Sequence, residues 1–269
     1  MSAPELPDLQ RARDGAVLLL TLDRPDARNA YSEAMVDSLV RALDDADRDD
    51  EVRCVILTGA GPAFSAGGDL KRMLQHEGMF AGGPVDLRRR YIDGIQRIPR
   101  RLALLEKPII AAINGPAIGA GLDLACMCDL RIVARGAQLG STFVKVGLVP
   151  GDGGAYFLAR TVGFPRALEL MLTARLVDAD EAERIGLVHR VVEPAELLPA
   201  ARALAQQIAA NAPLAVRLTK RAAYRSHEAD LEQALELAAT YQGVVQNTAD
   251  HREAVRAMLE RRPPVFTGG

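Results

Sequence analysis

The segments most able to do chemistry are rich in glycine and follow short apolar runs. Four of them stand out, and they cover residues 58–71, 107–130, 139–161 and 186–193. Glycine after a strand allows backbone N–H groups to approach a ligand closely, because no side chain is in the way. Two converging N–H groups form an oxyanion hole, which stabilises negative charge on a carbonyl oxygen. A single glycine pair is more often only a tight turn. The occurrence of four such segments in one chain therefore favours a functional role more than any one of them does.

Nucleotide binding is excluded by residue type. In GAGPAF (59–64) and GAGLDL (119–124), the position that requires the third glycine of G-x-G-x-x-G holds Phe64 and Leu124. The chain also lacks the phosphate-binding sequence G-x-x-x-x-G-K-[ST]. These glycines are therefore not predicted to bind the phosphates of a nucleotide.

A backbone site for a carbonyl group remains as the use of the glycines. FSAGGDL (64–70) and NGPAIGAGLDLA (114–125) suit it, because small residues flank a glycine directly before a helical pattern. The start of a helix also carries partial positive charge, which favours a negative oxygen at the same place. These two segments are therefore predicted to supply the N–H groups of an oxyanion hole.

The elements that position these segments alternate between strand and helix. Short β-branched runs predict strands over 16–22, 52–58, 109–113, 130–134 and 187–192. Helical periodicity predicts helices over 32–47, 87–105 and 121–128. Repeated strand-then-helix order implies mostly parallel strands with crossover connections, and hence an α/β fold. Residues 77–84 combine glycines with a proline and are predicted to form a mobile loop.

The last part of the chain has only helical periodicity. Four helical segments follow one another from residue 196 onward. We therefore predict an α/β core over residues 1–195 and a helical region over residues 196–269. The helical region could cover its own core or pack on a neighbouring subunit.

Composition and charge make nucleic acid and membranes poor partners. Of the 269 residues, 49% are hydrophobic and 25% are charged, and the formal net charge is -2. Such a chain has no general attraction for polyanions or anionic surfaces. The three cysteines lie in apolar runs without metal-ligand spacing, so no metal site is predicted and a reducing cytoplasm fits. No signal peptide and no membrane-spanning run of about 18 apolar residues is recognised.

Several segments, in this order and spacing, resemble the signature segments of the crotonase family of enoyl-CoA hydratases and isomerases. They are FSAGGDL (64–70), KPIIAAINGPAIGAGLDLACMCDLRIVA (107–134) and GLVPGDGGAYFLARTVG (147–163). LDRPDARNAYSEAM (22–35) resembles the family's first CoA-contacting segment. The resemblance extends from about residue 17 to residue 268. It implies a crotonase-like spiral of ββα units with a helical C-terminal region.

The resemblance assigns binding roles residue by residue. The two oxyanion N–H groups of the family fall on Gly68 and Ala120. Its CoA contacts fall on Ala27, Arg28, Ala30, Ala66, Asp69, Leu70 and Lys71. Arg24, Arg28 and Lys71 are candidates to meet the CoA phosphates, although each is equally well explained as a solvated charge. Coenzyme A belongs to the substrate, so no separate cofactor is implied.

The catalytic positions depart from the family pattern. Hydratases of the family hold one water between two glutamates, whose positions fall on Asp123 and Phe143 here. Asp123 keeps a carboxylate, whereas Phe143 has no group that can move a proton. Asp152 is a further candidate, because some family isomerases place their acid in this turn, one residue earlier by count, at Gly151. Each aspartate also has a structural alternative, Asp152 as a helix cap and Asp123 as a first-turn carboxylate.

The resemblance implies enolate chemistry on an enoyl-CoA thioester, by hydration or by double-bond isomerisation. Gly68 and Ala120 would stabilise the enolate, and Asp123 and Asp152 would share proton transfer. Phe143 favours isomerisation, whereas the commonest activity of the family is hydration. One alternative is a non-catalytic acyl-CoA-binding homologue, expected if the two aspartates do not converge. The other is a peptidase of the same fold, for which no serine or cysteine stands with a base.

The resemblance also covers the assembly and the acyl-binding wall. It implies a homotrimer or a dimer of trimers. Met73, Met79 and Phe80 are predicted to line the acyl chain, whereas Tyr91 and Tyr156 could line it or belong to the core.

Overall fold

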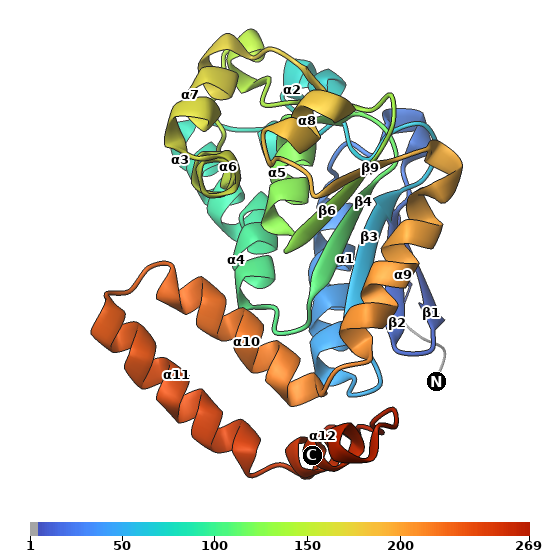
Figure 1. Ribbon diagram of the computed structural model, residues 1–269. Helices are drawn as coiled ribbons and strands as arrows, with labels where there is room; N and C mark the ends of the chain where they lie inside the picture. Colours follow the sequence, from blue (N-terminus) through green and yellow to red (C-terminus); the bar gives the residue numbers. More distant parts are fainter. Residues whose placement is uncertain (1–4) are drawn as a thin grey trace.

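The computed structural model describes residues 5–269 and shows a mixed α/β architecture built on a six-stranded sheet (Figure 1). The strand order is β1-β2-β3-β4-β6-β9, and every neighbouring pair is parallel except β1 with β2. The strands are β1 (Leu9–Asp14), β2 (Val17–Leu22), β3 (Cys54–Gly59), β4 (Ile109–Ile113), β6 (Leu130–Ala134) and β9 (Arg190–Val192). The predicted α/β class with parallel strands is confirmed.

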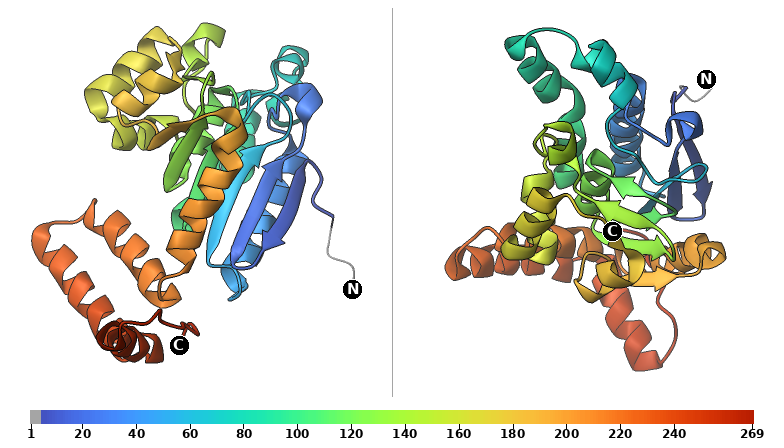
Figure 2. Two further views of the ribbon diagram at one scale, coloured as in Figure 1. Left: turned by 45° about the vertical axis from the view of Figure 1, so that its right-hand side comes forward. Right: turned by 90° about the horizontal axis from the view of Figure 1, so that it is seen from above.

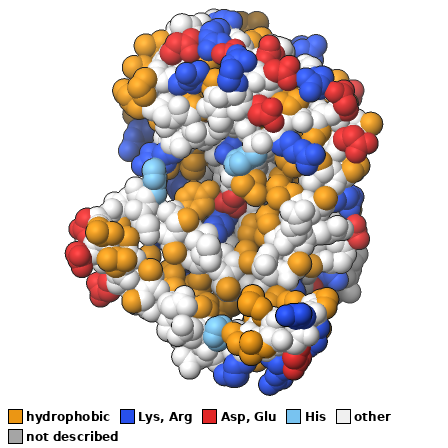
Figure 3. All heavy atoms as spheres, in the orientation of Figure 1, with side chains coloured by type: hydrophobic (Ala, Val, Ile, Leu, Met, Phe, Trp, Pro, Cys, Tyr) orange, Lys and Arg blue, Asp and Glu red, His pale blue; other side chains and the backbone are white. Residues whose placement is uncertain are grey.

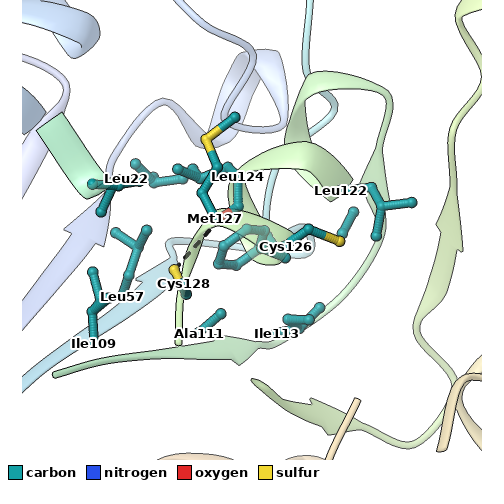
Figure 4. Close-up of a cluster of buried hydrophobic side chains, with 14 of the residues drawn as sticks. Leu22, Leu57, Ile109, Ala111, Ile113, Leu122, Leu124, Cys126, Met127 and Cys128 are labelled. Carbon is teal, nitrogen blue, oxygen red and sulfur yellow. Dashed lines mark hydrogen bonds between the residues drawn. The ribbon is translucent and has the colours of Figure 1, made fainter. Parts of the chain in front are cut away.

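Helices cover both faces of this sheet, because successive residues of a strand point to opposite faces. Ile109, Ala111 and Ile113 of β4 belong to the core on one face. Ile110 and Ala112 belong to a second core on the other face. The first face carries α1 (Glu33–Arg48), α4 (Arg97–Leu104) and α5 (Ala120–Met127), and the second carries α9 (Leu197–Ala209). Figure 4 shows side chains of α5 among those of the strands.

A second, three-stranded sheet is made of very short strands. They are β5 (Ala117–Ile118), β7 (Gln138–Gly140) and β8 (Val177–Asp178). The remaining helices of this part are η1 (Pro25–Ala27), α2 (Leu70–Gln75), η2 (Gly78–Phe80), η4 (Phe143–Val146), α6 (Gly154–Val162), α7 (Phe164–Thr173), α8 (Ala179–Arg184) and η5 (Pro194–Glu196). Strands of two or three residues are too short to show alternation, so the sequence did not predict this sheet.

The single helix predicted over residues 87–105 is wrong. The chain forms α3 (Pro84–Arg90), a π-helical turn η3 (Tyr91–Ile95) and then α4. The break centres on Gly94, whose φ of -109° and ψ of -106° lie outside the helical region. Residues 77–84, predicted as a loop, contain η2 and the first residue of α3. Met79 of η2 is buried, so this segment is anchored to the core.

Three C-terminal helices extend away from the sheet (Figures 1 and 2). They are α10 (Pro213–Ser226), α11 (Leu231–Gln246) and α12 (Ala249–Glu260). Ion pairs connect α10 to the core, with Lys220 bound to Asp129 at 2.7 Å and Arg217 bound to Glu106. By contrast, α11 has no buried residue and does not cover the core.

The predicted division at residue 196 falls before α9, which packs on the sheet. Leu197, Ala201 and Ala205 of this helix are buried against it. The part of the chain that packs on the sheet therefore extends through α9. None of the described helices is both long and apolar enough to cross a bilayer.

Candidate active site

A mainly apolar cavity lies where the loop after β3, the start of α5 and the segment after β7 meet. Its empty volume is about 670 Å³, part of it open to solvent. The lining residues are Tyr31, Ala66, Gly68, Leu70, Met73, Met79, Phe80, Tyr91, Ile95, Ile118, Gly119, Ala120, Thr142, Phe143, Val146, Leu148 and Asp152. The predicted wall residues Met73, Met79 and Phe80 are all among them, whereas Tyr156 is not.

The two proposed oxyanion donors, Gly68 and Ala120, both line this cavity. They come from segments that touch through glycines. Gly67 has a φ of +79°, and a Cβ atom on it would lie 2.5 Å from the carbonyl oxygen of Ile118 and 2.8 Å from the amide nitrogen of Ala120. A Cβ atom on Gly121 would overlap the carbonyl of Ser65. Glycine at these positions therefore allows the loop to lie against the first turn of α5.

Both donor N–H groups are free to bind a ligand. Within residues 5–269, neither the Gly68 nor the Ala120 amide makes a hydrogen bond to a protein acceptor. Ala120 is the first residue of α5, where amide groups have no partner within the helix. The helix dipole adds partial positive charge at the same point. The arrangement is suited to an oxygen that gains negative charge.

The predicted CoA-contacting residues fall on two segments that the structure joins. The amide of Ala66 donates to the carbonyl of Arg28 at 2.9 Å, and the Ser65 hydroxyl donates to the carbonyl of Asn29 at 2.7 Å. Ala27, Arg28 and Ala30 therefore lie beside the loop that carries the other four predicted contacts, Ala66, Asp69, Leu70 and Lys71. Arg28 and Lys71 are exposed, as a contact to CoA phosphates requires.

The guanidinium of Arg24 is engaged by other protein groups and is not a free cation. Its guanidinium donates to the carbonyl of Ala30 at 2.6 Å and lies 3.5 Å from both Asp8 and Asp69. Asp69 also caps α2 by accepting the amide of Arg72 at 3.3 Å. Both side chains thus hold the two binding segments together.

Asp123 and Asp152 converge in the interior, although only Asp152 lines the cavity. Their exposed fractions are 0% and 2%. The Asp123 carboxyl group lies against Gly154, where a Cβ atom would overlap both of its oxygens. Among the described residues, no N–H or O–H group makes a well-formed hydrogen bond to the carboxyl oxygens of either aspartate. The helix-cap interpretation of Asp152 is therefore wrong: it accepts no amide at the start of α6, whose N-cap is Gly153.

The two carboxyl groups affect each other's titration. Burial raises the pKa of Asp123 well above its ordinary value, and the like charge of Asp152 raises it further. Burial also raises the pKa of Asp152. The pair as a whole therefore retains a proton at a pH where isolated carboxyl groups are already ionised.

Three further aromatic residues line the cavity together with Asp152. The ring of Tyr91 packs on Gly151, and burial together with the charge of Asp152 raises the pKa of its hydroxyl. Phe143 is half-buried and lies beside Gly119. Tyr31 also lines the cavity and is only 1% exposed. Tyr31 was not predicted from the sequence, because a tyrosine before a helix gives no signal that it faces a cavity.

The described residues offer neither a metal site nor a reactive cysteine. No group of three or more His, Cys, Asp or Glu side chains there is arranged to hold a metal ion. Cys54, Cys126 and Cys128 are buried free thiols, and burial raises the pKa of each to about 12. A thiol with so high a pKa is a poor nucleophile.

Comparison with known proteins agrees with the resemblance seen in the sequence. A sequence profile described as enoyl-CoA hydratase/isomerase matches residues 12–269. Short-chain-enoyl-CoA hydratase of Clostridium acetobutylicum is 39% identical, over 96% of this chain and 97% of that protein. 1,2-Epoxyphenylacetyl-CoA isomerase of Escherichia coli is 38% identical, over 94% and 95%.

Solved structures match the fold as closely. The enoyl-CoA hydratase of Bacillus anthracis superposes with a TM-score of 0.91 at 35% identity, covering 97% of this chain and all of that one, 100%. The predicted crotonase-type fold is confirmed by this match. With a profile that spans nearly its whole length and relatives near 40% identity that align from end to end, this chain belongs to the enoyl-CoA hydratase/isomerase family.

Proposed function

We propose that the chain acts on an enoyl-CoA thioester and moves its double bond through an enolate. The thioester oxygen would accept hydrogen bonds from the N–H groups of Gly68 and Ala120. In support, both residues line the cavity, and neither amide makes a hydrogen bond within residues 5–269. Each donor of this kind contributes on the order of 3 kcal/mol to the transition state.

Asp152 would carry the proton. For a 3-enoyl thioester, the Asp152 carboxylate removes a proton from C2, and the electrons of that C–H bond form the dienolate. Asp152 then returns the same proton to C4, which leaves a 2-enoyl thioester with no net gain or loss of atoms. The apolar walls, including Phe143, raise the basicity of the carboxylate, which favours this transfer. Asp123, buried behind Asp152, would share the titration of the pair with it.

One observation carries the preference for isomerisation. Of the residues that line the cavity within the described chain, Asp152 is the sole carboxylate, and Phe143 contributes a phenyl ring. Hydration by a water held between two carboxylates would require a second carboxylate facing the substrate, and the cavity wall offers only Asp152. A single carboxylate that takes and returns one proton is sufficient for double-bond migration.

Hydration is the second candidate, and the names of the relatives favour it. Short-chain-enoyl-CoA hydratase and the crotonyl-CoA hydratase of Syntrophomonas wolfei are 39% and 37% identical to this chain. In a hydration, Asp152 would take a proton from water as the water oxygen attacks C3, and Asp152 would then deliver that same proton to C2 of the enolate. The convergence of Asp123 and Asp152 supports either enzyme over a non-catalytic binder.

Coenzyme A would enter only as part of the substrate, along residues 27–30 and 66–71.

We also propose a homotrimer or a dimer of trimers, located in the cytoplasm. In support of assembly, α11 and α12 expose apolar side chains, including Leu231 (71%), Met258 (81%) and Leu259 (80%). Figure 3 shows hydrophobic side chains around the hollow between α10 and the core, whose empty volume is about 1520 Å³, part of it open to solvent.

The experiment is a turnover assay with matched 2-enoyl- and 3-enoyl-CoA esters. Isomerisation of a 3-enoyl ester creates a conjugated thioester and raises its ultraviolet absorbance, whereas hydration of a 2-enoyl ester removes it. Asp152→Asn should abolish the activity, and the surface variant Asp45→Asn should retain it. Unchanged turnover in Asp152→Asn would contradict the proposed role. Loss of absorbance from 2-enoyl esters without any conversion of 3-enoyl esters would establish hydration instead.

A further inference from the structure

Tyr31 connects the two segments that carry the proposed oxyanion donors. It directly precedes Ser32, the N-cap of α1, and is buried. Its amide donates to the carbonyl oxygen of Gly67 at 2.7 Å. Its hydroxyl group donates to the carbonyl oxygen of Ala120 at 3.3 Å. One residue therefore reaches the loop on one side and the first turn of α5 on the other.

The first of these bonds fixes the direction of a donor. The carbonyl of Gly67 and the N–H of Gly68 belong to one planar peptide unit, so they point in opposite directions. When the amide of Tyr31 holds this carbonyl, the Gly68 N–H is aimed away from that amide, and Gly68 itself lines the cavity. A hydrogen bond to the carbonyl also polarises the same peptide unit and makes its N–H a stronger donor.

The second bond acts on the other donor. Ala120 begins α5, and its carbonyl belongs to the peptide unit that follows the amide proposed to bind the thioester oxygen. The Tyr31 hydroxyl remains a neutral donor, because burial and the charges of Asp152 and Asp123 raise its pKa. A phenylalanine would fill the same space but could not hold this carbonyl.

We propose that Tyr31 is a positioning residue that sets the distance and direction between the N–H groups of Gly68 and Ala120. The inference rests on the proposed function, since it assumes that these two groups form the oxyanion hole. It predicts that the hydroxyl group contributes to stabilisation of the enolate rather than to proton transfer. Tyr31→Phe removes only the hydroxyl, and leaves the ring and the amide bond to Gly67 in place.

The test measures stabilisation of an enolate without turnover. Acetoacetyl-CoA ionises to an enolate that absorbs in the near ultraviolet, so its apparent pKa can be titrated in the bound state. The wild-type protein should lower this pKa relative to free acetoacetyl-CoA. Tyr31→Phe should bind the enolate between about twofold and tenfold more weakly, which raises the apparent pKa of the bound compound by up to about 1. In turnover, kcat should fall by a similar factor with little change in KM.

Three outcomes separate the possibilities. A wild-type protein that leaves the pKa of acetoacetyl-CoA unchanged would overturn the proposed oxyanion hole, whatever Tyr31 does. A lowered pKa in the wild type that is identical in Tyr31→Phe would overturn the inference alone. Tyr91→Phe is the comparison, because Tyr91 lines the same cavity but packs on Gly151. An equal rise in Tyr91→Phe would trace the effect to general cavity polarity and also overturn the inference.

Discussion

Replacing Gly67 by alanine should inactivate the oxyanion hole through a steric contact. The new Cβ atom would lie 2.5 Å from the carbonyl oxygen of Ile118 and 2.8 Å from the amide nitrogen of Ala120. Both are main-chain atoms that cannot rotate away, so the loop and the first turn of α5 must separate. Such a shift misaligns at least one donor, and the loss of one donor costs about 3 kcal/mol, or about 100-fold to 1,000-fold in kcat.

The same substitution also costs stability, and this cost needs a control. A left-handed backbone conformation disfavours alanine by about 1–2 kcal/mol. Gly163 has the same φ of +79°, but an alanine methyl group there would meet no atom within 4 Å, and the residue lies outside the cavity. Gly163→Ala should therefore lose stability in urea unfolding from backbone strain alone and keep its kcat. Wild-type kcat in a folded Gly67→Ala protein would refute the reasoning, as would an equal loss of kcat in Gly163→Ala.

Three further predictions concern the carboxyl groups. Asp152→Asn should lower kcat by about 100-fold to 10,000-fold; because burial raises the pKa of Asp152 and the base must be ionised, wild-type kcat/KM should rise with pH above the ordinary carboxyl pKa of about 4. A raised pKa in the folded state means that Asp123 stabilises the fold below the unfolded pKa and that this contribution is lost as pH rises through the folded pKa. Asp123→Asn should therefore melt at a higher temperature than wild type at neutral pH, with the gain vanishing near pH 4, and an unchanged difference across pH would contradict it. Phe143→Glu should increase hydration of 2-enoyl-CoA relative to isomerisation of 3-enoyl-CoA, and an unaltered product ratio would argue against Phe143 as the determinant.

Strands with continuous apolar runs could be read from the sequence, and β4 and β6 were predicted to the residue. Such strands are buried on both faces, so nearly every position reports the environment. By contrast, β1 was missed because five of its six residues are exposed, and QRARD carries no apolar alternation. The break at Gly94 was missed for a related reason, since the apolar spacing continues from α3 into α4 across it.

The two segments proposed for the backbone site were identified from the sequence, and the structure brings Gly68 and Ala120 to the same cavity. Their role as an oxyanion hole stays a prediction. The close approach of the two main chains at Gly67 and Gly121 became visible only in the structure. The family membership inferred from these segments is confirmed by the profile that matches residues 12–269.

Only the tertiary structure showed which of the candidate side chains line the cavity and which lie behind it. It placed Asp152 on the cavity wall and Asp123 behind it against Gly154, and it brought Tyr31 to both donor segments. In the structure, Arg24 pairs with Asp8 and Asp69, so its charge is not free for a CoA phosphate. These contacts join residues that are distant in sequence, so the spacing of residues along the chain could not predict them. The sequence alone determined which groups could do the chemistry, and the packing of α5 and α6 determined which one meets the substrate cavity.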